Sequence, residues 1–190
     1  MQVIIYGLGT IGSNLFVQLI RQFPDWRYTG VDFDKVEDRN LRVQAYFKEH
    51  IKAAKASALA SIGARYVHNL QYLPLVFKVE TPLTPEVSRD YLYIDCFDNR
   101  FSRKLLNVKN GANILHLGFS PLYATECIWD DKYDPPNDIS SDLPDICQMA
   151  DAIGFIQFFL GAVTMVISEW ADNLVKKSFI ITNKTKIVWI

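Results

Sequence analysis

The chain has 190 residues, of which 49% are hydrophobic, enough for one α/β domain with a sizeable core and little more. Its formal net charge of −1 gives no electrostatic sign of nucleic-acid or membrane binding. The 3 cysteines include no CxxC pair, which excludes a four-cysteine zinc site and favours reduced thiols in a cytoplasmic protein. The first core strand begins at the N-terminus, so we expect no signal peptide, and we expect a single domain over 1–190.

The opening stretch alternates strand and helix signals. Residues 2–6 form a short apolar, β-branched run, and 13–23 carry apolar residues at helical spacing. Residues 27–31 then read as a second strand. The opening therefore predicts a strand, a turn, a helix and a strand, which is one βαβ unit.

Three glycines and two acids occupy the turns of this unit. Gly7 permits a tight turn, Gly9 lets a phosphate approach the backbone, and Gly12 lets the helix pack close to the sheet. Asp32 and Asp34 follow the second strand, about 20 to 25 residues past the glycines. This is near the usual interval for an acid that accepts hydrogen bonds from ribose hydroxyls. The pattern predicts nucleotide binding at the helix start. The alternative is a glycine turn that only packs a βαβ unit.

The rest of the chain alternates strands with helices, as in a parallel, doubly wound sheet. Residues 130–147 are rich in Asp, Pro and Ser without periodicity, and we interpret them as a flexible crossover loop whose acids are either solvated or a metal site. The apolar stretch 152–167 is too short for a confident membrane span and reads as a buried helix. The expected elements are helices over 51–65, 84–89 (capped by Thr84), 100–109 and 151–177, strands near 75–79 and over 91–96, 113–118 and 122–129, and a hairpin over 179–190.

Polar side chains follow several of these strands. Parallel strands bring their carboxyl ends to one edge of a sheet, so the glycine turn, the two acids and the pairs Asn40/Arg42 and Asp98/Asn99 should meet in one crevice. An Asp beside an Arg and a Lys suits Mg-ATP, because the cations bind phosphate and the carboxylate binds the metal.

Five segments, in order, resemble one known family. They are GLGTIGSNL at 7–15, VDFDKVEDRNLRVQ at 31–44, KAAKASA around Lys55, DCFDNRFSRKLLN at 95–107 and the segment from Cys147 to Trp170. Together they resemble the ubiquitin-activating-enzyme-like superfamily, the ThiF/MoeB/HesA group. The resemblance implies a Rossmann-like, mostly parallel sheet with a long C-terminal helix and a terminal hairpin.

The resemblance also implies an activity. Members of this group bind ATP and Mg²⁺ together with the C-terminal carboxylate of a ubiquitin-like or sulfur-carrier protein, form an acyl-adenylate and release pyrophosphate. They usually act as dimers, so we expect a homodimer or a site completed by a partner. The alternatives are a non-catalytic nucleotide- or partner-binding relative, since the family's usual zinc cysteines and N-terminal arginine are missing here, and a small NAD-dependent oxidoreductase.

Individual roles carry over by position. Asn40, Lys55, Asp98 and Asn99 each have a structural alternative: a turn cap, an exposed helix lysine and, for the last two, a helix cap. Cys147 precedes the long helix, where a thiolate has a lowered pKa, and its alternative is a packed thiol. The resemblance implies that Gly7, Gly9 and Gly12 form a phosphate turn, that Asp32 and Asp34 contact the nucleotide with one on the ribose, and that Asn40 and Lys55 contact phosphate. It further implies that Arg42 replaces the arginine that the family usually has at Val43. Asp98 would be a Mg²⁺ ligand with Asn99 beside it, and Cys147 would take part in thioester or persulfide chemistry.

Overall fold

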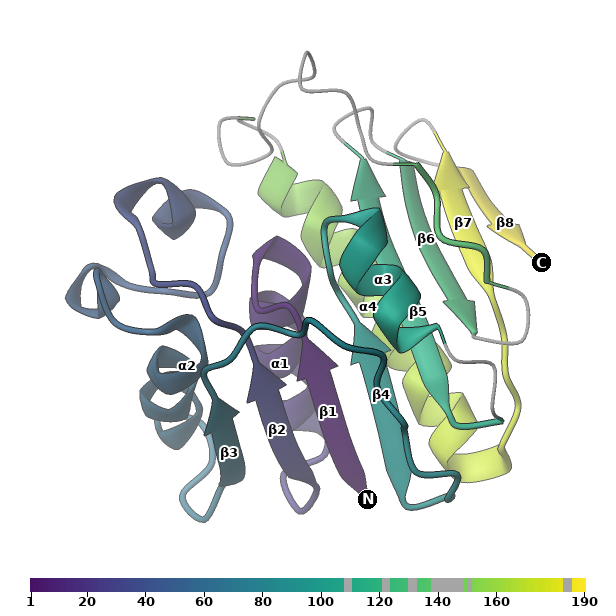
Figure 1. The fold of residues 1–190 in the computed structure, drawn as a ribbon, viewed down its shortest axis with the longest axis horizontal. Helices are drawn as coiled ribbons and strands as arrows, with labels where there is room; N and C mark the ends of the chain where they lie inside the picture. Colours follow the sequence, from purple (N-terminus) through teal and green to yellow (C-terminus); the bar gives the residue numbers. More distant parts are fainter. Residues whose placement is uncertain (108–110, 121–123, 130–132, 138–148, 150–151, 183–185) are drawn as a thin grey trace.

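The computed structural model describes the whole chain apart from residues 108–110, 121–123, 130–132, 138–148, 150–151 and 183–185. In the described part, 8 strands form one sheet in the order β3-β2-β1-β4-β5-β6-β7-β8 (Figure 1). The strands are β1 Gln2–Tyr6, β2 Arg27–Val31, β3 Gln71–Leu75, β4 Tyr91–Asp95, β5 Ile114–Ser120, β6 Ala124–Trp129, β7 Phe179–Thr182 and β8 Lys186–Trp189. The α-helices are α1 Thr10–Gln22, α2 Lys55–Ala64, α3 Arg100–Leu106 and α4 Ala152–Asn173, and two short 3₁₀ helices cover Asp38–Arg42 and Lys48–His50.

The sheet changes character halfway across. Strands β3, β2, β1, β4 and β5 are parallel neighbours, whereas β6, β7 and β8 are added antiparallel. This confirms the predicted Rossmann-like, mostly parallel sheet with its long C-terminal helix and closing hairpin. The direction of the connections reverses between β1 and β4. From β1, the sheet grows through β2 and β3 on one side, and through β4 and β5 on the other. Open α/β sheets bind ligands at such a switch point.

Helices cover both faces of the sheet, which explains why its inner strands are almost continuously apolar. On β1, the buried side chains Val3 and Ile5 belong to the core under α1, α2 and α4. Ile4 and Tyr6 alternate with them and join a smaller core with Leu106 of α3. Figure 1 shows α3 in front of the strands, α1 and α4 behind them, and α2 beside the edge strand β3.

The long helix α4 packs as a core helix. It is 22 residues long with a mean hydropathy of 1.7 over its most apolar window, so by length and composition it is apolar enough to cross a membrane, in contrast to the shorter stretch considered above. Half of that window is buried inside the fold, through side chains such as Phe159, Val163 and Ile167. The expected buried helix is therefore confirmed on the face that α4 turns toward α1 and the sheet.

Two predictions about the middle of the chain are wrong. The third strand lies at 71–75 instead of 75–79, because Gln71 to Leu75 pair in register with β2 and Pro74 is tolerated on an edge strand. The expected helix over 84–89 is absent from these described residues. The Leu83 amide donates to the Leu105 carbonyl and the Glu86 amide to the Tyr93 hydroxyl, which holds the segment extended against α3 and β4.

Candidate nucleotide-binding site

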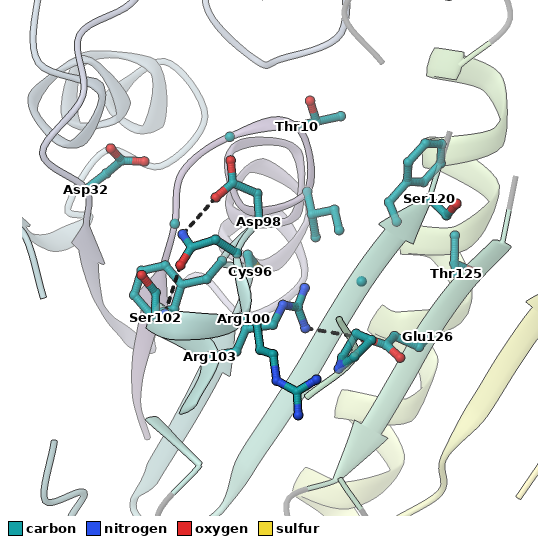
Figure 2. Close-up of a pocket in the computed structure, with 18 of the residues that line it drawn as sticks. Thr10, Asp32, Cys96, Asp98, Arg100, Ser102, Arg103, Ser120, Thr125 and Glu126 are labelled. Carbon is teal, nitrogen blue, oxygen red and sulfur yellow. Dashed lines mark hydrogen bonds and ion pairs between the residues drawn. The ribbon is translucent and has the colours of Figure 1, made fainter. Parts of the chain in front are cut away.

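A cavity of about 840 Å³ opens at the carboxyl ends of the parallel strands, at the switch point between β1 and β4. Its lining includes the glycine turn after β1, the acids after β2 and the Asp98 turn after β4, together with residues of β5, β6 and β7 (Figure 2). The predicted convergence of these strand ends is therefore present in the fold.

The three glycines of the first turn have different structural reasons. Gly7 has φ +83°, and a side chain there would press on the Cys96 carbonyl. A Cβ on Gly12 would collide with the Gly7 carbonyl oxygen, so α1 can approach the turn only without one. A Cβ on Gly9 would meet none of the described atoms within 4 Å, and Gly9 and Thr10 line the cavity. The N-cap residue Gly9 supplies no side-chain cap to α1, so among the described residues the first amides of this helix remain available to an anion.

The acids after β2 are held by backbone and by a lysine. Asp32 accepts hydrogen bonds from the amides of Leu8 at 2.7 Å and Asp34 at 2.8 Å. Burial raises the pKa of the Asp32 carboxyl, against the opposing effect of Lys55. Lys55 donates from Nζ to Asp34 Oδ2 at 3.0 Å and is 8% exposed, so its reading as an exposed helix lysine is wrong. All three side chains line the cavity.

The segment after these acids brings in a different arginine from the one expected. Asn40 is buried, lines the cavity and accepts a hydrogen bond from the Glu37 amide at 2.8 Å, which confirms its turn-capping role. Arg42 is exposed and is not among the described residues that line the cavity, so its role in the site stays a prediction. Arg39 lines the cavity instead and pairs with Glu37 at 2.6 Å. Arg42 lies one 3₁₀ turn, about 6 Å, farther along the helix axis.

Asp98 and Asn99 divide two tasks between them. Asn99 caps α3, because its Oδ1 accepts a hydrogen bond from the Ser102 amide at 2.9 Å. Its Nδ2 donates to Asp98 Oδ1 at 3.2 Å, which leaves the exposed Asp98 carboxylate in the middle of the cavity (Figure 2). The helix-cap reading is thus confirmed for Asn99, and Asp98 remains the candidate metal ligand.

The donor set fits Mg²⁺ only when a phosphate shares it. Within the described residues there is no group of three or more His, Cys, Asp and Glu side chains that could hold a metal. Mg²⁺ typically takes one or two carboxylates and completes its shell with water and phosphate oxygens. Gln44 also lines the cavity, and its buried Oε1 has no hydrogen-bond partner among the described residues, so this oxygen is available to a ligand.

The cysteines add little to this site. Cys147 lies outside the described residues, as does most of the 130–147 segment. Cys96 lines the cavity and Cys127 is fully buried, and burial raises the pKa of both thiols. A raised pKa keeps a thiol protonated and unreactive at neutral pH.

A buried ionic network next to the cavity gave no signal in the sequence. His116 Nδ1 lies 2.7 Å from Asp95 Oδ2, and both side chains are fully buried. Arg103 donates to the Tyr133 hydroxyl at 2.6 Å and reaches Glu126 at 3.4 Å. No spacing in the sequence links these residues, because they come from β4, α3, β5, β6 and the segment after β6.

Comparisons with known proteins agree with this fold. Crystal structures of PaaA (16% identity, TM-score 0.72), of E. coli MccB with MccA (12%, 0.76) and of E. coli MccB with ATP (13%, 0.74) each match the whole chain, which spans 63% of each of those chains. No curated protein matches the sequence. The family model of the ThiF family matches residues 1–171. The chain therefore belongs to the ThiF family.

Proposed function

We propose that this protein binds Mg-ATP in the cavity and adenylates the C-terminal carboxylate of a ubiquitin-like or sulfur-carrier protein. The observation that carries the proposal is the convergence on one cavity of an open glycine turn after β1, the buried Lys55 at the start of α2 and the exposed Asp98 after β4. Family membership supports the same chemistry, as does the neighbouring structure of E. coli MccB with ATP.

The lining offers a place for each part of ATP. The phosphates would lie over Gly9 and the first amides of α1, within reach of Lys55. The Asp32 carboxylate fits a ribose hydroxyl. Phe33 directly follows Asp32 and lines the cavity, as does Phe77, and both offer apolar surface to the base. The volume of 840 Å³ is within the usual range of about 300–1,000 Å³ for ligand pockets.

The reaction asks the protein mainly to position groups and balance charge. A carboxylate oxygen of the acceptor attacks the α-phosphorus, a new P–O bond forms, and the bond to the β-phosphate oxygen breaks so that pyrophosphate leaves with the electron pair. Lys55 and Arg39 balance negative charge on the phosphates. Asn99 orients Asp98, which would hold Mg²⁺, and the ion when bound neutralises phosphate charge.

We further propose that a second chain completes the site, either another copy or a partner, and that the protein acts in the cytoplasm. Dimers are usual in the group that the sequence resembles, which supports a second chain at this site. Structures of MccB have been determined together with MccA, which supports a peptide or protein partner here.

Calorimetric titration with Mg-ATP, and separately with NAD, tests the proposal. We expect the unmodified protein to bind Mg-ATP and to show no binding of NAD. Asp98→Asn should weaken Mg-ATP binding at least about tenfold through the lost metal ligand. Asp90→Asn changes an exposed acid that does not line the cavity and should leave binding unchanged.

Two results would contradict the proposal. NAD binding without Mg-ATP binding would point to an oxidoreductase. Mg-ATP binding without any ATP–pyrophosphate exchange, when candidate carrier proteins are supplied, would favour the non-catalytic relative.

A further inference from the structure

The cavity extends well beyond the part assigned to ATP. Figure 2 shows Asp32 on one side and Ser120, Thr125 and Glu126 on the other, with Asp98 and Arg103 between them. We call the second part the far lobe and define it by Gly118, Ser120, Thr125, Glu126, Ile180 and Thr182, which all line the cavity. These residues come from β5, β6 and β7, which the nucleotide does not need.

Glu126 is the acidic side chain among the residues that define the far lobe. It stands on β6 between Gly118 of β5 and Ile180 of β7. Its carboxylate lies directly over Gly118, where a Cβ would fall 2.5 Å from Oε1, so a glycine at that position leaves room for it. The side chain is 23% exposed and lines the cavity, so the carboxylate is accessible to a ligand.

The charges around Glu126 leave capacity for a cation. Among the described residues, Arg103 is the cation that pairs with Glu126, and its Nη1 lies 3.4 Å from Glu126 and 3.9 Å from Asp95, so two carboxylates share one guanidinium. Arg103 also donates to the Leu117 carbonyl and the Tyr133 hydroxyl. An ionised carboxylate offers about four acceptor positions, more than Arg103 and Tyr133 fill among the described residues.

We propose that Glu126 selects the acceptor: the far lobe binds the residues that precede the reacting carboxylate, and Glu126 pairs with a cationic group on them. This inference rests on the proposed adenylation, since it places the acceptor beside the ATP end of the same cavity. An accessible carboxylate in a partly desolvated pocket repels an acidic acceptor and favours an ammonium or guanidinium group. Ser120 and Thr182 add hydroxyl groups for the peptide backbone.

Three dipeptides of similar size and different charge test the inference on the intact protein. Acetyl-Gly-Lys, acetyl-Gly-norleucine and acetyl-Gly-Glu are titrated in the presence of Mg-AMP, with dissociation constants taken from NMR chemical-shift changes. The lysine dipeptide should bind at least tenfold more tightly than the norleucine dipeptide, and the glutamate dipeptide should bind most weakly. Glu126→Gln keeps the size and shape of the side chain and should abolish the preference for lysine.

The matched control is Glu169→Gln on α4, where the carboxylate pairs with Lys177 away from the cavity lining. That variant should keep the preference. Equal binding of the lysine and norleucine dipeptides, no binding of any dipeptide, or a lysine preference that survives in Glu126→Gln would overturn the inference. Mg-ATP titrations of the same proteins separate the two proposals, because intact ATP binding with no lysine preference refutes only the role of Glu126.

Discussion

Arg39 and Arg42 lie three residues apart on one 3₁₀ helix, yet of the two only Arg39 lines the cavity. The neighbouring Val43 is fully buried in the main core and has no charge to offer a phosphate. A guanidinium is suited to phosphate because it presents several N–H donors in one plane. Arg39 is therefore the residue of this segment that we assign to charge balance on ATP.

The two arginines make a matched pair of variants. Arg39→Gln should weaken Mg-ATP binding by about 1.5–3 kcal/mol, the usual value of a hydrogen bond to a charged group. Arg42→Gln should change it by less than about 0.5 kcal/mol, as for a surface substitution. Calorimetric titration of both variants decides between them. A larger loss in Arg42→Gln than in Arg39→Gln would contradict the assignment.

At the scale of the elements, two helical glycines have opposite surroundings. Gly12 in α1 faces the Gly7 carbonyl, which belongs to the turn that forms the phosphate end of the cavity. At Gly161 in α4, an added Cβ would have no described atom within 4 Å, apart from those of its own helix. The contrast arises because α1 starts inside the turn, whereas this side of α4 is exposed.

The same substitution should therefore have opposite effects in the two helices. Gly12→Ala should destabilise the protein by about 3 kcal/mol, because the backbone must move to relieve the collision. Gly161→Ala should stabilise it by about 0.5–1 kcal/mol through the lower entropy of the unfolded chain. Denaturant unfolding of both variants measures the two changes. Destabilisation by Gly161→Ala would show that this face is covered in solution.

At the scale of the whole molecule, buried tyrosines link stability to pH. Burial, with a smaller contribution from Tyr93, raises the pKa of Tyr6 from 10.0 to about 12. An unfolded tyrosine releases its proton near pH 10, whereas the native one keeps it to about pH 12, so the unfolded chain binds fewer protons in that window. The stability is therefore fully present below pH 10 and falls as the pH rises toward 12. Burial raises the pKa in the same direction for Tyr28, Tyr46, Tyr72 and Tyr133.

Urea unfolding at pH 9, 10 and 11 checks this expectation. The free energy of unfolding should fall with each step, and Tyr6→Phe should make the fall shallower, since Phe keeps the packing without the ionisable hydroxyl. Tyr66→Phe changes a tyrosine that is 49% exposed and should leave the slope unaltered. An equal effect of the two substitutions would refute the role of burial.

Local patterns predicted the parts of the fold that depend on short spacings. The β1–α1–β2 unit was predictable because alternating apolar runs and the glycines act within a few residues of one another. The position of β3 was not predictable, because its register comes from pairing with β2. That pairing includes Pro74, and a proline is normally taken to interrupt a strand. The helix expected over 84–89 does not form for a similar reason. Hydrogen bonds to Tyr93 and Leu105, which come later in the sequence, hold Glu86 and the preceding Leu83.

The sequence by itself determined the family, the order of strands and helices over most of the chain, and the residues at the strand ends. Each of these follows from neighbours along the chain. The tertiary structure decided that Lys55 is buried against Asp34, that Arg39 and not Arg42 lines the cavity, and that Arg103 joins Asp95 to Glu126. These contacts join residues from separate elements, and their distances depend on how the sheet brings the elements together.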